Sequence, residues 1–147
     1  MGIREYKEAD FSAIVDIYAA SKLDELRFEP QKFKLTSLNL DPQRLVAFHE
    51  SEVLVYEEER VSAYLGTHLN HIRSIFVSPI YRGKGIGRQL LEHAIAHAKG
   101  ELSLDVVKSN VIAKNLYSHY GFKIVNEFVS SYDGMPVVVN TMKRQSS

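Results

Sequence analysis

A glycine-rich turn carrying three basic side chains is the part of this sequence best suited to chemistry. A mostly apolar strand pattern at residues 72–77 precedes it, and a helical pattern begins within it. Such a junction directs several backbone N–H groups at one point, next to the partial positive charge of a helix N-terminus. Glycine leaves the main chain open to an anion, and the basic side chains add full charges. We therefore predict a diphosphate-binding turn, formed by Arg82, Gly83, Lys84, Gly85, Ile86, Gly87 and Arg88.

The glycine spacing distinguishes this turn from two other phosphate-binding motifs. A dinucleotide fingerprint reads G-x-G-x-x-G, and its third glycine would fall on Arg88. A P-loop requires G-x-x-x-x-G-K-[ST], which does not occur in the sequence. The turn instead matches [RQ]-x-x-G-x-[GA], with Arg82, Gly85 and Gly87 in the fixed places. In this it resembles the GNAT superfamily of acetyl-CoA-dependent N-acetyltransferases.

Two later segments strengthen the resemblance to the GNAT family. Residues 110–122 fill every fixed position of N-x-x-A-x-x-L-Y-x-x-x-G-F, a pattern common in that family. A final hairpin follows, with strands at 128–132 and 136–142 and a turn at Asp133 and Gly134. The resemblance covers residues 60–143 well and residues 1–59 in outline.

The order of predicted elements indicates an α/β (α+β) fold and a single domain, residues 1–147. A strand–helix–strand unit at 72–107 implies one parallel strand pair. The remaining sheet is expected to be mostly antiparallel and flanked by helices, as in GNAT proteins. Strands are predicted at 3–6, 53–56, 61–66, 72–77, 102–107, 128–132 and 136–142, and helices at 11–18, 42–48, 86–99 and 111–120.

The resemblance implies acetyl-CoA as co-substrate, with its diphosphate on the turn. In similar proteins the preceding strand pairs its main chain with the pantetheine arm, a role that would fall here to Ile75, Phe76 and Val77. The N–H of Phe76 or Val77 would then stabilise the oxyanion. Asn110 is expected either to contact the pantetheine arm or to cap the helix that begins at residue 111.

The resemblance also assigns proton transfers. Tyr117 stands where the family has its general acid, and a phenol with a pKa of about 10 can protonate a departing thiolate. The family often uses a glutamate base in the strand before the turn, but residues 71–77 contain no acid. Asp105 and His71 remain as candidate bases, and we favour Asp105. The alternatives are that Asp105 pairs with Arg73 and that His71 is a solvated strand-end residue.

Composition limits the other classes of function. Lys plus Arg total 18 and Asp plus Glu total 18, which gives no argument for nucleic acid or an anionic membrane as partner. With no cysteine, a disulfide framework, a cysteine nucleophile and a thiolate metal site are excluded. His93 and His97 lack a third ligand, so we expect no metal. No signal peptide or membrane span is evident, and a cytoplasmic location is expected.

The predicted function is acetyl transfer from acetyl-CoA to a primary amine, by direct attack in a ternary complex. The amine belongs to a small molecule or a protein, and the protein is expected to be a monomer or homodimer. Residues 20–45 contain acidic and apolar side chains that either line an acceptor pocket or form ordinary helix faces. The alternative function is a non-catalytic CoA-binding regulatory module of the same fold.

Overall fold

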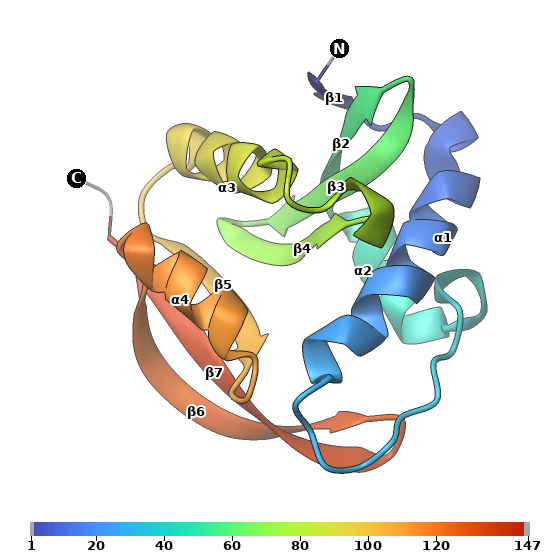
Figure 1. Ribbon diagram of the computed structural model, residues 1–147. Helices are drawn as coiled ribbons and strands as arrows, with labels where there is room; N and C mark the ends of the chain where they lie inside the picture. The colour runs from blue at the N-terminus through green and yellow to red at the C-terminus, as the bar shows by residue number, and fades with distance from the viewer. Residues whose placement is uncertain (1, 146–147) are drawn as a thin grey trace.

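The computed structural model describes residues 2–145, which are built around one seven-stranded sheet (Figure 1). Its strands are β1 (Gly2–Glu5), β2 (Glu52–Glu58), β3 (Arg60–His68), β4 (His71–Val77), β5 (Leu102–Val107), β6 (Lys123–Tyr132) and β7 (Met135–Arg144). The α-helices are α1 (Phe11–Lys22), α2 (Pro42–Glu50), α3 (Ile86–His97) and α4 (Val111–His119). A short 3₁₀ helix, η2 (Leu23–Leu26), directly continues α1. The predicted α/β class is confirmed.

The strand order is β1-β2-β3-β4-β5-β7-β6, and only β4 and β5 run parallel. The predicted mixed sheet with a parallel strand–helix–strand unit is therefore confirmed. β4 pairs with β5 only through His71 and Ile72. Arg73 follows as an extra residue in β4 relative to β3. Because such a bulge bends its strand, β4 and β5 part beyond Ile72 and leave an open strand edge.

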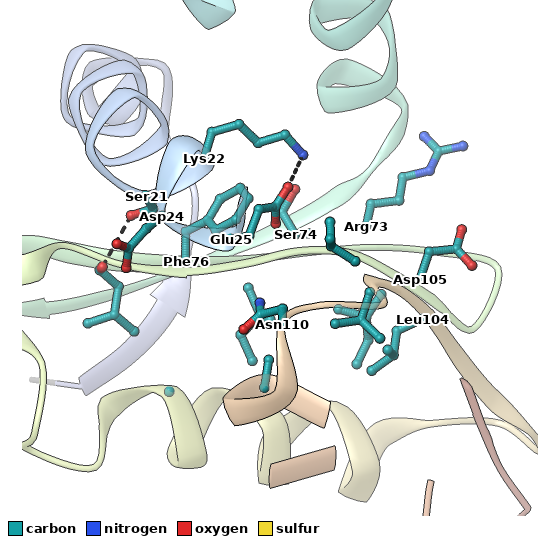
Figure 2. Close-up of a pocket in the computed structure, with 18 of the residues that line it drawn as sticks. Ser21, Lys22, Asp24, Glu25, Arg73, Ser74, Phe76, Leu104, Asp105 and Asn110 are labelled. Atoms are coloured by element: carbon teal, nitrogen blue, oxygen red, sulfur yellow. Dashed lines mark hydrogen bonds and ion pairs between the residues drawn. The ribbon is translucent and has the colours of Figure 1, made fainter. Parts of the chain in front are cut away.

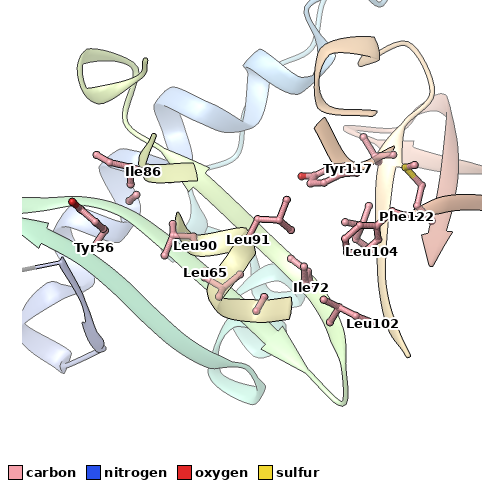
Figure 3. Packing of buried hydrophobic residues seen from close by; sticks show 14 residues of the cluster. Tyr56, Leu65, Ile72, Ile86, Leu90, Leu91, Leu102, Leu104, Tyr117 and Phe122 are labelled. Carbon is pink, nitrogen blue, oxygen red and sulfur yellow. The ribbon is translucent and has the colours of Figure 1, made fainter. Parts of the chain in front are cut away.

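Helices cover both faces of the sheet (Figure 1). Successive strand residues point to opposite faces, so Val55 and Tyr64 pack under α1 and α2, whereas Tyr56 and Leu65 belong to the cluster under α3 and α4. Figure 3 shows this second cluster, to which α3 contributes an apolar stripe at helical spacing. Within it α3 buries Ile86, Leu90, Leu91 and Ala94. The cluster fixes the start of α3 against β4.

Two hairpins turn through left-handed backbone. Leu69 and Asn70 join β3 to β4 with φ of 50° and 61°, and Asp133 and Gly134 join β6 to β7 with φ of 54° and 75°. Positive φ at both central residues matches the twist of the strands, and the turn predicted at 133–134 is confirmed. β6 begins earlier than expected, at Lys123.

Asp10 directly precedes the helix predicted at 11–18, and its side chain is of a type that commonly caps a helix N-terminus. Asp10 makes no side-chain cap bond to α1. Its carboxylate instead accepts two hydrogen bonds of 2.9 Å from the Arg4 guanidinium and one of 2.8 Å from the N–H of Lys7. These bonds attach β1 to the entry of α1. Among residues 2–145, none of the helices has the length and apolar character needed to cross a bilayer.

Candidate active site

A cavity of about 950 Å³ occupies the opening between β4 and β5. Ser78 donates its N–H to the carbonyl of Ser62 in β3 at 2.8 Å. Because main-chain groups alternate in direction along a strand, those of Phe76 also face β3, whereas those of Ile75 and Val77 face the opening. Of the two expected oxyanion donors, the N–H of Val77 therefore points into the opening and that of Phe76 does not. Phe76 contributes its ring to the cavity lining.

The carbonyl of Val77 has a partner on α1. Ser21 donates its hydroxyl to this oxygen at 3.2 Å, as Figure 2 shows. Ser21 is itself buried. The contact joins the end of α1 to the open edge of β4, so α1 forms one wall of the cavity.

The glycine-rich turn presents unpaired backbone donors beside that edge. Within residues 2–145, the N–H groups of residues 83–88 have no hydrogen-bond acceptor, and the first bond of α3 runs from Gln89 to the carbonyl of Gly85 at 3.0 Å. Gly83 and Gly85 adopt φ of 80° and 78°, and a Cβ at either would meet no atom within 4 Å. A row of exposed N–H groups at a helix N-terminus fits a diphosphate. The residues present thus fit the group that the sequence implies.

The three basic side chains of the turn have different surroundings. Arg82 forms an ion pair with Asp24 of η2, so the turn is tied to the segment that follows α1. The ammonium of Lys84 lies 5.3 Å from the ring centre of Tyr81. Arg88 is exposed in the first turn of α3. Lys84 and Arg88 add positive charge beside the unpaired N–H groups.

Tyr117 and Asn110 reach the cavity from α4. Tyr117 is 9% exposed, and burial, followed by the negative charge of Glu25, raises the pKa of its hydroxyl. The phenol therefore keeps its proton at neutral pH. Asn110 lies at the N-cap position of α4 but makes no side-chain cap bond, and its buried side chain lines the cavity. The predicted cap is therefore not formed, and the contact with the pantetheine arm stays a prediction.

His71 and Asp105, the two candidate bases, contact each other. His71 Nε2 lies 3.5 Å from Asp105 Oδ2, and His71 Nδ1 lies 2.7 Å from the hydroxyl of Ser103. The hydrogen bond from His71, with a second from Thr141, holds the pKa of Asp105 below its usual value. The alternative pairing of Asp105 with Arg73 is not found, because Arg73 binds Glu50 at 3.0 Å.

Three cavity residues were not singled out from the sequence as a site. They are Lys22 at the end of α1, Glu25 in η2 and Tyr132 at the end of β6. The acids of residues 20–45 had been noted, and a helical spacing of three would have paired Lys22 with Glu25. Nothing local connects this pair with Tyr132, which lies more than a hundred residues later.

No group of three or more His, Asp or Glu side chains is arranged to hold a metal within residues 2–145. The rings of His93 and His97 stack with centres 4.0 Å apart. The expected absence of a metal stays a prediction.

A family model described as acetyltransferase (GNAT) family matches residues 10–122, well over half of the chain. The chain belongs to the GNAT family of acetyltransferases. The family assignment explains why the unpaired N–H row and the open edge of β4 occur together in one cavity. Both features lie within the matched residues.

Among relatives of this GNAT protein is the peptidyl-lysine N-acetyltransferase YjaB. The Escherichia coli protein is 35% identical over 72 residues, and its Salmonella typhimurium counterpart is 33% identical. These matches cover 49% of this chain and 48% and 49% of the relatives, about half of their length.

Solved structures agree in fold along almost the whole chain. The solution structure of apo-form YjaB from Escherichia coli has a TM-score of 0.73 at 23% identity and covers 99% of this chain and 97% of that one. YncA of Salmonella typhimurium, solved with its cofactor acetyl-CoA, has a TM-score of 0.72 at 23% identity and covers 100% and 94%. Identities this low show the shared fold alone.

Proposed function

We propose that this protein transfers an acetyl group from acetyl-CoA to a primary amine. The observation that carries the proposal is the row of unpaired N–H groups at residues 83–88, beside the open edge of β4. A diphosphate satisfies such donors with charge-assisted hydrogen bonds. An extended arm bearing amides can pair with a free strand edge. One cavity thus offers partners for both parts of the same ligand.

Bound acetyl-CoA supplies an acetyl group activated as a thioester. The main chain of Ile75 and Val77 orients the ligand, and the N–H of Val77 stabilises the negative charge that develops on the carbonyl oxygen. Asn110 adds a polar contact. Tyr117 holds a proton at its hydroxyl, which burial keeps in place, and donates it to the departing thiolate. Direct attack by the amine requires no covalent bond to the protein.

The contact between His71 and Asp105 supports a paired base. A proton accepted by the pair resides on the imidazole, and the carboxylate of Asp105 stabilises the imidazolium. Because its pKa is lowered, Asp105 is better suited to stabilising a neighbouring cation than to accepting the proton by itself. We therefore propose the pair of His71 and Asp105 as the base, in place of Asp105 alone.

For the acceptor we favour the amine of a lysine side chain over other amines. The relatives named peptidyl-lysine N-acetyltransferase support this choice, although they match over about half their length. On the α1–α2 side the cavity lining includes the acidic Glu25 and several aromatic rings, beside the basic Lys22 and Arg44. The carboxylate and the rings suit an aliphatic ammonium group.

The test measures release of the CoA thiol with acetyl-CoA and three acceptors: a lysine peptide, a peptide with a free N-terminus only, and n-butylamine. We expect turnover with the lysine peptide. Tyr117→Phe should lower kcat by about a hundredfold, the lower end of a general acid's contribution, with an unchanged Kd for acetyl-CoA.

Tyr120→Phe is the matched control, since that hydroxyl binds Glu92 at 2.7 Å on the surface. Tight binding of acetyl-CoA with no transfer to any acceptor would favour the non-catalytic module. Normal turnover by Tyr117→Phe would refute the acid assignment.

A further inference from the structure

The ammonium of Lys22 is buried on the α1 side of the cavity. Only 8% of Lys22 is exposed, although it ends a helix at the edge of a large cavity. Burial lowers the pKa of its amine, and the charge of Glu25 opposes that shift. The stem of a lysine is long enough to carry its ammonium group to solvent. Because a buried charge is costly, an ammonium group that stays buried requires specific partners.

Those partners form a set of groups suited to a cation. Lys22 Nζ lies 4.9 Å from the ring centre of Tyr132 and 5.9 Å from that of Phe76. Ring faces at these distances attract an ammonium group, and the attraction grows when water is excluded. Tyr132 ends β6 and Phe76 lies in β4, so two distant strands contribute.

Glu25 supplies the negative charge of this set. Its Oε1 lies 2.6 Å from Lys22 Nζ, and Figure 2 shows the two groups meeting inside the cavity. The two groups form an ion pair, and within residues 2–145 no other donor approaches this buried oxygen. Because a buried carboxylate oxygen without a partner is costly, removal of the Lys22 ammonium favours entry of another cation in its place.

We propose that Glu25, Tyr132 and Phe76 form the binding site for the acceptor's ammonium group, and that Lys22 occupies this site in the free protein. The inference rests on the proposed acetyl transfer and adds the acceptor's chemical class, an unbranched aliphatic primary ammonium. Such a group has the shape and charge of the lysine head that fills the site. Lys22 must swing out before an acceptor enters, which its flexible stem allows.

Competition by Lys22 has a measurable consequence. If Lys22 fills the site for about nine-tenths of the time, the apparent Kd of an acceptor is raised about tenfold. Lys22→Met removes the charge and keeps an unbranched apolar stem, so it should bind an ammonium ligand about tenfold more tightly. Glu25→Gln keeps the shape and removes the carboxylate; added to Lys22→Met, where no lysine competes for the site, it should weaken binding about tenfold or more.

The probe is n-butylammonium chloride, titrated by calorimetry into the full chain without acetyl-CoA, with sodium butyrate as the carboxylate of similar shape. Lys32→Met and Glu8→Gln serve as matched controls because both side chains are exposed. Tyr132→Leu added to Lys22→Met tests the aromatic wall and should weaken n-butylammonium binding severalfold. Lys22→Gln also removes the competing charge and replaces Lys22→Met as the background if Lys22→Met does not fold.

The expected result is tighter n-butylammonium binding by Lys22→Met than by wild type, loss of that gain when Glu25→Gln or Tyr132→Leu is added to Lys22→Met, and no change in the controls. Butyrate binding that Lys22→Met abolishes would overturn the proposal, because Lys22 would then recognise an acidic ligand. Equal affinities in Lys22→Met with and without Glu25→Gln would also overturn it. Binding as expected with no acetyl transfer would refute the proposed function and leave this site standing.

Discussion

Substitution of Gly85 tests the diphosphate-binding turn most directly. Gly85 adopts φ of 78°, and a Cβ there meets no atom within 4 Å. A residue with a side chain costs about 1–2 kcal/mol in this left-handed conformation, so Gly85→Ala should lower the free energy of unfolding by that amount. The added methyl group occupies space that no protein atom fills, within the turn that carries the unpaired N–H groups. It should therefore also obstruct the diphosphate.

The size of the binding defect follows from the donors that are blocked. A hydrogen bond to a charged group contributes about 1.5–3 kcal/mol, so loss of two costs about 3–6 kcal/mol. This corresponds to a Kd for acetyl-CoA raised by at least about a hundredfold. Gly85→Glu adds a negative charge to the same place and should abolish measurable binding.

Gly134 provides the matched control. It adopts φ of 75° with equally open space at its Cβ, but it lies in the turn between β6 and β7. Gly134→Ala should lose similar stability in urea titrations and retain the wild-type Kd for acetyl-CoA in calorimetry. If Gly85→Ala bound acetyl-CoA as tightly as Gly134→Ala, the assignment of the turn would be wrong.

Two further predictions concern protons. His71→Ala and Asp105→Asn should each lower kcat/KM by about a hundredfold and displace the acidic limb of its pH profile, because the pair takes up the proton together; an unmoved limb in both would exclude it. The hydrogen bonds from Arg4 hold the pKa of Asp10 below its usual value. That stability is present above the unfolded pKa and is lost as pH falls through the folded one. Asp10→Asn should therefore lower the free energy of unfolding by about 1–3 kcal/mol at neutral pH and flatten its fall as the pH drops below about 5, measured by urea titration.

Much of the fold was predictable because its signals are local. A helix was predicted at 42–48, and Asp41, the residue before it, accepts the N–H of Arg44 at 3.2 Å as the N-cap of α2. Asp10 has the same carboxylate and also precedes a helix, but it does not cap α1. Its carboxylate binds the guanidinium of Arg4 in β1 instead. A capping residue can be read from sequence, but a competing partner in another element cannot.

Within the candidate site, the pairing of His71 with Asp105 shows the same limit. Each residue was identified as a candidate base, yet their contact arises from the short parallel pairing of β4 with β5. Arg73 lies at the bulge just beyond this pairing, and its side chain forms an ion pair with Glu50 of α2 rather than with Asp105. Side-chain partners across strands depend on register and on the bulge at Arg73, neither of which the local pattern specifies.

The sequence alone determined the turn at residues 82–88, because glycine spacing, permitted φ and a helix start act within a few neighbouring residues. Tertiary structure alone decided the ammonium site of Glu25, Phe76 and Tyr132. These side chains come from η2, β4 and the end of β6, and only packing of the sheet against α1 brings them around the head group of Lys22. Backbone conformation is specified locally, whereas a pocket assembled from distant segments is specified by the whole fold.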